Sequence, residues 1–145
     1  MKNATGRQIF DLLNELQTIF NRNLESYFSK WSLTSSQILV LSLLYNHLEL
    51  RISEIASSIG LPDSNVSGII DRLEKAGYVE RSRNTKDRRV VNVKLTDKVN
   101  EIKNEFDLNL EEYFQQLLEK NTQKEIDEIA HKLEKLKSML LQFKG

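Results

Sequence analysis

The segment 81–94 carries the residues of this sequence that are best suited to binding a polyanion. It holds one acidic residue, Asp87, and six basic ones: Arg81, Arg83, Lys86, Arg88, Arg89 and Lys94. A guanidinium near the tip of a hairpin can enter a narrow DNA minor groove, where the negative potential is enhanced. A solvated hairpin is the plain alternative, and charge alone favours neither. Because Asp87 would repel phosphate, we expect it to fix the orientation of an arginine.

A second candidate surface is the outer face of a helix expected at about 62–76. Its buried stripe has three- and four-residue spacing and consists of Val66, Ile69, Ile70 and Leu73. This spacing turns the remaining residues outward: Ser64, Asn65, Ser67, Gly68, Asp71 and Arg72. Ser and Asn can hydrogen-bond to base edges, and a glycine lets a helix approach a sugar-phosphate backbone. An ordinary solvent-exposed face is the alternative, although such faces are usually richer in Lys and Glu.

The elements expected around these surfaces form a recognisable order. They are an apolar helix opened by Thr34 and Gln37, a short helix at 53–59 ended by Gly60, the helix at 62–76, and a two-stranded hairpin at 78–95. A capping-box pattern, a glycine stop and a change of hydrophobic period from 3.6 to two support these boundaries. In a helix-turn-helix the second helix enters the major groove. We therefore expect a mainly α fold with a small β-hairpin wing, a winged helix-turn-helix.

Long amphipathic helices are expected on both sides of this lobe. Capping-box patterns open the first at Thr5 and Gln8 and the last at Thr122 and Glu125. Apolar residues recur at helical spacing in all of them: Ile9, Leu12, Leu16, Ile19 and Trp31 in the first, Val99, Ile102, Phe106, Leu110, Tyr113 and Leu117 in the next, and Ile126, Ile129, Leu133, Leu136 and Leu140 in the last. Narrow seams with charged flanks are typical of helix pairing. We expect this pairing to join two copies of the chain; antiparallel packing within one chain is the alternative.

Composition argues against several other classes. The chain has 21 basic and 21 acidic residues, no Cys and two His, so disulfides and thiolate metal sites are excluded. His47 and His131 lie on different expected helices, and there is no phosphate loop, nucleophile elbow or paired-His motif. We expect no enzyme activity, metal or cofactor. The longest apolar run, 38–45, is far shorter than the roughly 20 residues of a membrane helix; we expect a soluble, cytoplasmic protein with no membrane partner.

The sequence resembles the multiple-antibiotic-resistance regulator (MarR) family of bacterial transcription factors over nearly its whole length. The matching stretches are LTSSQILVLSLL, ISEIASSIGLPDSNVSGIIDRLEKAGYVER and KDRRVVNVKLT. The family's wing motif (Asp, any residue, Arg, then a strand ending in Leu-Thr) falls on Asp87, Arg88, Arg89, Leu95 and Thr96. The sequence departs from the pattern at Val99, where Gly is common, and at Ser82, where a second Arg is common.

The resemblance implies a single MarR-like domain over residues 1–145. It would have dimerisation helices at 5–31 and 96–145 and a winged helix-turn-helix lobe at 34–95, with the recognition helix at about 62–76 and the wing at about 78–95. The homodimer would bind a pseudo-palindromic operator in double-stranded DNA and repress transcription. A small, partly apolar effector would relieve repression. The alternative is a winged-helix module for protein–protein contact, such as an antirepressor.

The expected DNA contacts lie on two elements. They are Ser64, Asn65, Ser67, Gly68 and Arg72 on the recognition helix and Arg83, Lys86, Arg88 and Arg89 on the wing, with Asp87 orienting an arginine. The match to the family motif favours Arg89 for the minor groove, which leaves Arg88 for a backbone phosphate.

Overall fold

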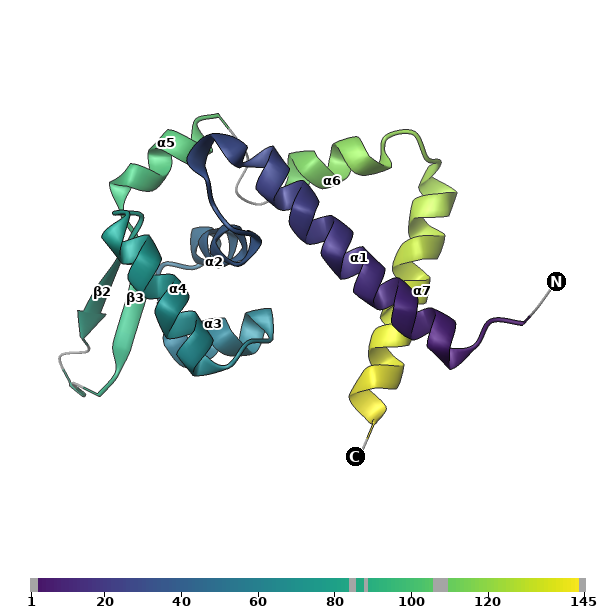
Figure 1. The fold of residues 1–145 in the computed structure, drawn as a ribbon, viewed down its shortest axis with the longest axis horizontal. Helices are drawn as coiled ribbons and strands as arrows, with labels where there is room; N and C mark the ends of the chain where they lie inside the picture. Colours follow the sequence, from purple (N-terminus) through teal and green to yellow (C-terminus); the bar gives the residue numbers. More distant parts are fainter. Residues whose placement is uncertain (1–2, 84–85, 88, 106–109, 144–145) are drawn as a thin grey trace. The chain divides into compact units, whose positions relative to one another are not determined.

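The computed structural model describes residues 3–83, 86–87, 89–105 and 110–143. The chain divides into two compact units, Met1–Asn109 and Leu110–Gly145. The first unit contains α1 (Gly6–Tyr27), η1 (Ser29–Trp31), α2 (Ser35–Tyr45), β1 (Leu50–Arg51), α3 (Ile52–Ile59), α4 (Asp63–Lys75), β2 (Val79–Arg83), β3 (Val91–Leu95), η2 (Asp97–Val99) and α5 (Asn100–Lys103). The second contains α6 (Glu111–Leu118) and α7 (Gln123–Gln142), as Figure 1 shows.

The core of the first unit is built around α2. This helix contacts α1, α3, α4 and β3, and its buried side chains are Ile38, Val40, Leu41 and Leu44. Its expected capping box is confirmed: Thr34 Oγ1 accepts a hydrogen bond from the Gln37 N–H at 3.2 Å, and Gln37 Oε1 accepts one from the Thr34 N–H at 2.9 Å. An apolar, well-capped central helix gives the neighbouring helices a fixed surface to pack on.

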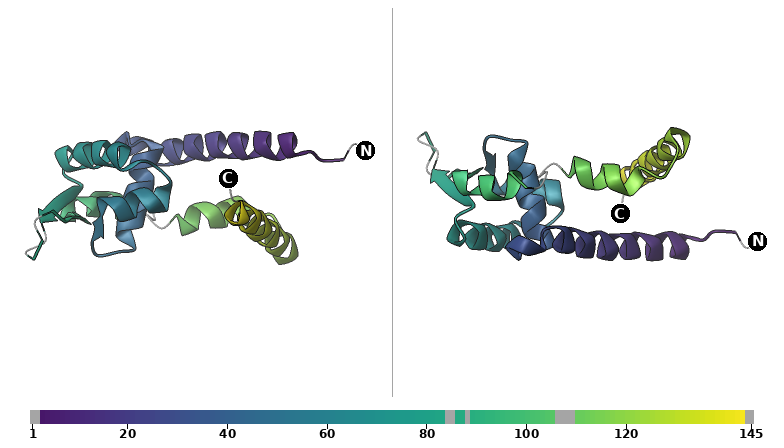
Figure 2. Two further views of the ribbon diagram at one scale, coloured as in Figure 1. Left: turned by 90° about the horizontal axis from the view of Figure 1, so that it is seen from below. Right: turned by 90° about the horizontal axis from the view of Figure 1, so that it is seen from above.

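The sheet is antiparallel and has the strand order β1-β3-β2. Val93 is its buried centre and pairs with Arg81 on one side and Leu50 on the other. The β2–β3 hairpin was expected, whereas the two-residue strand β1 was not, because so short a segment has no periodicity. The hairpin extends outward from the helices (Figures 1 and 2). The predicted fold class, a mainly helical winged helix-turn-helix, is confirmed.

Helix α1 is long, and most of its apolar face is uncovered. Thr5 and Gln8 form the expected capping box, but the helix ends at Tyr27, and the η1 turn replaces the last turn that the sequence predicts. Leu24 and Phe28 are buried. Six large side chains on the N-terminal part are 38–57% exposed: Ile9, Phe10, Leu12, Leu13, Leu16 and Ile19. This part of the helix extends beyond α2–α4 as a straight rod (Figures 1 and 2).

The prediction of one continuous helix through residues 99–117 is wrong. Helix α5 ends at Lys103 and α6 begins at Glu111. Leu110 has a φ of 63°, a left-handed conformation that cannot continue a right-handed helix. Phe106 lies outside the described residues.

The last helix, α7, begins where the sequence predicts. Thr122 Oγ1 accepts a hydrogen bond from the Glu125 N–H at 3.2 Å, which is half of the expected capping box. No side chain of α7 is buried.

Among the described residues, no helix is both long and apolar enough to cross a membrane.

Candidate DNA interface

The chain forms a helix-turn-helix from α3 and α4. Gly60 ends α3 with a φ of 74°, a conformation that glycine adopts without strain, and Pro62 caps α4 rather than filling its first turn as expected. The four residues predicted to anchor this helix, Val66, Ile69, Ile70 and Leu73, are all buried. Because α4 is anchored along this one face, its opposite face is directed outward.

The outward face of α4 carries polar side chains with unused hydrogen-bonding groups. Ser64, Asn65 and Arg72 are exposed, and Ser67 is half-buried. Within the part of the chain that the structure describes, none of these four side chains makes a hydrogen bond or ion pair. A row of short amide and hydroxyl groups without internal partners is suited to binding base edges.

Gly68, in the middle of the same face, has no packing reason to be a glycine. A Cβ built on it would meet nothing within 4 Å, and its φ is not positive. Glycine inside a helix costs roughly 0.5–1 kcal/mol relative to alanine. A glycine that lowers helix stability without relieving any steric clash within the chain suggests that another molecule approaches the helix closely at this position.

We therefore expect Gly68→Ala to change stability and DNA binding in opposite directions. The melting temperature should rise, because alanine favours the helix by roughly 0.5–1 kcal/mol. Affinity for DNA should fall, because the methyl group occupies space on the contact face. Thermal unfolding and gel shifts on the same preparation measure both. A variant that is more stable and binds DNA as tightly as the wild type would contradict this use of the glycine.

The wing tip holds an internal Asp–Arg pair. Asp87 Oδ1 accepts hydrogen bonds from the Arg89 N–H at 3.0 Å and from its Nε at 3.1 Å, and Oδ2 accepts one from its guanidinium at 3.3 Å. The Arg89 side chain is nevertheless 91% exposed. Hydrogen bonds from Arg89, chiefly from its side chain and also from its backbone, lower the pKa of Asp87 below its ordinary value. The carboxylate of the pair therefore stays charged at neutral pH. Arg83 and Lys86 are exposed, whereas Arg88 lies outside the described residues.

Besides Arg89, two further bases in the segment 81–94 are held by acids of the same lobe. Arg81 contacts Asp71 at 2.7 Å and Glu74 at 2.9 Å, and Lys94 contacts Glu80 at 3.2 Å. Burial alone would lower the pKa of Arg81, but the hydrogen bonds and charges of the two α4 acids raise it above its ordinary value. Counting charges along the sequence therefore overstates the basic surface.

The carboxyl end of α4 is closed by residues that the sequence did not single out for this role. Lys98 Nζ donates to the Ala76 carbonyl at 2.6 Å, and Thr96 Oγ1 donates to the Gly77 carbonyl. Lys98 also lies 5.0 Å from the centre of the Tyr78 ring. A cation favours the negative end of a helix dipole. These contacts fix the end of α4 to the segment that leads into α5.

Comparison with known proteins agrees with this geometry. The family model described as MarR matches residues 33–91. Two curated proteins of Bacillus subtilis (strain 168) are similar: the uncharacterized HTH-type transcriptional regulator YfiV, 40% identical over 96 residues, and the HTH-type transcriptional repressor MdtR, 39% identical over 101 residues. The match spans 66% and 67% of this chain, and 60% and 64% of those proteins. The helix-turn-helix lobe of this chain, over residues 33–91, is a MarR-family domain.

Two solved protein–DNA complexes show the same fold. A structure of a mutant E. coli MarR complexed with operator DNA is 25% identical, with a TM-score of 0.77, and the match covers 88% of this chain and 92% of the other. The S. aureus MepR–DNA complex is 22% identical, with a TM-score of 0.75 over 95% of this chain and 99% of the other, and shows the fold alone. The resemblance found in the sequence is confirmed.

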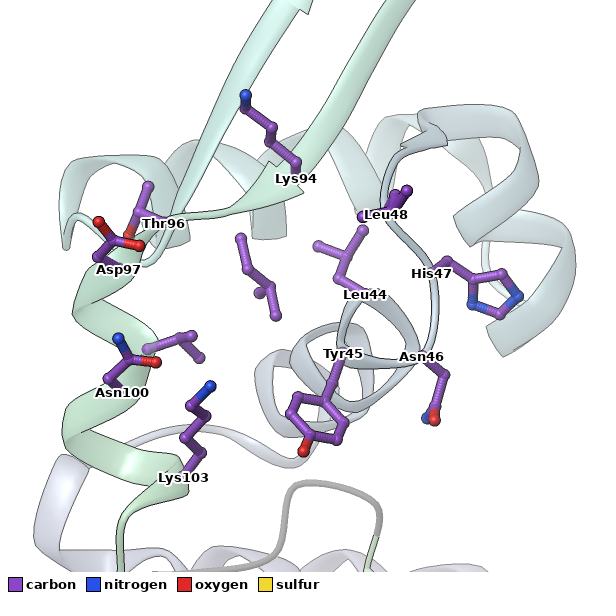
Figure 3. A pocket seen from close by; sticks show the side chains of 12 residues that line it. Leu44, Tyr45, Asn46, His47, Leu48, Lys94, Thr96, Asp97, Asn100 and Lys103 are labelled. Carbon is purple, nitrogen blue, oxygen red and sulfur yellow. The ribbon is translucent and has the colours of Figure 1, made fainter.

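The MarR lobe of this chain also has an open pocket of about 470 Å³ at the carboxyl end of α2. Figure 3 shows Leu44 and Tyr45 from α2 opposite Asp97 from η2 and Asn100 and Lys103 from α5. Its apolar floor includes the buried side chains Leu44 and Val99. One wall of the pocket lies in the segment 96–103. The same segment contains Thr96 and Lys98, whose hydrogen bonds hold the carboxyl end of α4.

Proposed function

We propose that this chain is a transcription regulator that binds double-stranded DNA and represses by occupying a pseudo-palindromic operator as a homodimer. The outer face of α4 carries the proposal, because Ser64, Asn65 and Ser67 have no partner within the described residues and an exposed arginine lies on the adjacent wing. The names of the relatives support it: MdtR is a transcriptional repressor, and the E. coli and S. aureus structures are DNA complexes. These relatives are regulators, not enzymes.

Dimerisation is supported by the uncovered apolar faces of α1 and α7. Besides the six side chains on α1, α7 exposes Ile129, Leu133 and Leu140 by 49%, 55% and 61%, and these lie on one helical face. A second copy of the chain would cover such surfaces. It would also place two α4 helices on half-sites about one DNA turn, roughly 34 Å, apart.

The proposal is tested by replacing Asn65, which we expect to contact base edges, and measuring DNA binding. The DNA is a fragment from upstream of the protein's own gene or a duplex selected by the wild type. Asn65→Ala should lose about 1–3 kcal/mol of binding free energy at the preferred site, and its sequence preference should relax at one or two base pairs. Binding to unrelated DNA should barely change, because phosphate contacts dominate there. Gel shifts measure both affinities; equal losses on preferred and unrelated DNA would refute base reading.

A protein–protein module is the second candidate, and the neutral net charge favours it. The same gel shifts separate the two functions. A module that acts only on proteins would bind no duplex preferentially, whereas a repressor should select one sequence over random DNA.

Control by a small, partly apolar effector belongs to the same proposal. The pocket beside α2 is within the usual range of ligand cavities, about 300–1,000 Å³, and its wall is joined to α4 through Thr96 and Lys98. A compound that binds there should raise the melting temperature and lower DNA affinity. Asn100→Trp, which fills the pocket from α5, should abolish both responses. A broad screen without either response would favour a constitutive repressor.

A further inference from the structure

Arg81, on strand β2 of the wing, is paired with two acids that lie one turn apart on α4. Its guanidinium donates to Asp71 Oδ1 at 2.7 Å and to Glu74 Oε1 at 2.9 Å. Its backbone N–H donates to Glu74 Oε2 at 3.2 Å. The Arg81 side chain is only 27% exposed, the least exposed of the cations that form ion pairs in the described residues. We refer to these three residues as the Arg81 bracket.

Attraction to DNA does not explain the Arg81 bracket. Two carboxylates and one guanidinium carry a net negative charge, which repels phosphate. Fold stability is a weak explanation as well, because the two carboxylates are 64% and 41% exposed and ion pairs with solvent-exposed partners stabilise proteins little. What the bracket does have is geometry: a planar guanidinium that contacts two partners fixes their direction as well as their distance.

The position of the bracket gives this geometry a consequence. Asp71 and Glu74 lie on the last turns of α4. Asn65 lies near its start, about 9 Å from Asp71 and about 14 Å from Glu74 along the axis at roughly 1.5 Å per residue. A rotation of α4 about its axis therefore moves the Asn65 side chain across the contact face. Arg81 belongs to the hairpin whose tip carries Arg89. The bracket thus fixes one DNA-facing element relative to the other.

We propose that Arg81 is a positioning residue for DNA recognition, which sets the rotation of α4 against the wing and so determines sequence preference without touching DNA itself. This inference rests on the proposed function. When the bracket is intact, the polar face of α4 and the wing arginine meet the major and minor grooves at the same time. Without it, each element can still contact phosphate, but the two are no longer in register.

The test uses Asp71→Asn and Glu74→Gln in the full-length protein, each of which removes one negative charge from the lobe. Affinity is measured for a duplex selected by the wild type and for a random duplex of equal length. Simple charge attraction predicts tighter binding to both. Positioning predicts that affinity for the selected duplex falls about tenfold, the order of one lost base contact, while affinity for the random duplex is unchanged or rises.

Three further variants make the result specific. Glu80 lies on the same strand as Arg81 and pairs with Lys94. Glu80→Gln therefore removes the same charge, and it should leave the ratio of the two affinities unchanged. Arg81→Lys keeps the charge but cannot hold both acids in a planar fork, so it should lower the ratio as Asp71→Asn does. In an Arg81→Met background, Asp71→Asn should have no further effect on the ratio. Melting temperatures report whether each variant is folded.

The outcomes separate the inference from the proposed function. If the wild type selects a duplex and Asp71→Asn, Glu74→Gln and Glu80→Gln all keep the wild-type ratio, the positioning role is wrong and the function stands. If folded wild-type protein selects no duplex at all, the proposed function and the positioning role both fail.

Discussion

Replacing Arg89 with Ala should weaken binding to operator and random DNA alike, apart from a modest change in preference for A·T pairs. An arginine in the minor groove gains from the local potential but distinguishes bases poorly, since the groove mainly separates A·T from G·C. The Arg89 side chain is 91% exposed at the wing tip and therefore accessible to DNA. The slope of log affinity against log salt should decrease by roughly 0.9 for each lost phosphate neutralisation, and a dimer loses one on each wing. Salt titrations of binding measure this slope.

The matched variant is Asp87→Ala, which should also weaken binding even though it removes a negative charge. Asp87 accepts three hydrogen bonds from Arg89, and without them the guanidinium loses its fixed direction. The lowered pKa of Asp87 implies that the carboxylate stays charged until the pH falls below its ordinary range. The effect should therefore be the same between pH 6 and 8. Tighter binding by Asp87→Ala, with the dimer intact, would mean that the wing is only a patch of charge.

Disrupting the apolar face of α7 should have the largest effect on assembly. Deleting residues 122–145 is expected to give monomeric or insoluble protein, because α1 and the remaining helices would keep apolar faces without a partner. Leu133→Glu is the sharper change, since glutamate is a good helix former and Leu133 is 55% exposed in the single chain. Sedimentation should show dissociation, together with a large loss of operator affinity as the second half-site contact is lost.

Lys132→Glu is the control for this change. It alters the charge of the same helix at an exposed neighbouring residue and should leave the dimer intact. A stable, folded monomer of the full-length chain at micromolar concentration would count decisively against dimerisation through these helices.

Local patterns were sufficient to predict most of the lobe. The capping boxes at Thr5 and Thr34 and the buried stripe of α4 depend on residues three or four apart, and each was found as expected. The break before α6 was not, because a helical repeat of apolar residues continues through it in the sequence while Leu110 adopts a left-handed conformation. Strand β1 was missed for a related reason: its pairing with β3 joins Leu50 to Val93, far apart in the chain.

The candidate site was only partly predictable for the same reason. The outward positions of Ser64 and Asn65 follow from the helical period. The pairing of Arg81 with two acids depends on the reversal of the chain after α4, at Gly77, whose φ is 90°. A list of charges along the chain contains no such information, so Arg81 was assigned to the basic segment. The contacts of Thr96 and Lys98 with the end of α4 depend on this reversal too.

The internal pairing of Arg81 and Lys94 has a consequence for the number of molecules that a cell would need. Affinity for random DNA comes almost entirely from cations that neutralise phosphates. Besides Arg89, the bases Arg81 and Lys94 near the wing are engaged by acids of their own lobe. A genome offers about 10⁶–10⁹ competing sites, so what governs operator occupancy is how much protein the rest of the chromosome sequesters. A regulator that withholds part of its charge leaves more of its copies free, and a small pool can keep its operator occupied.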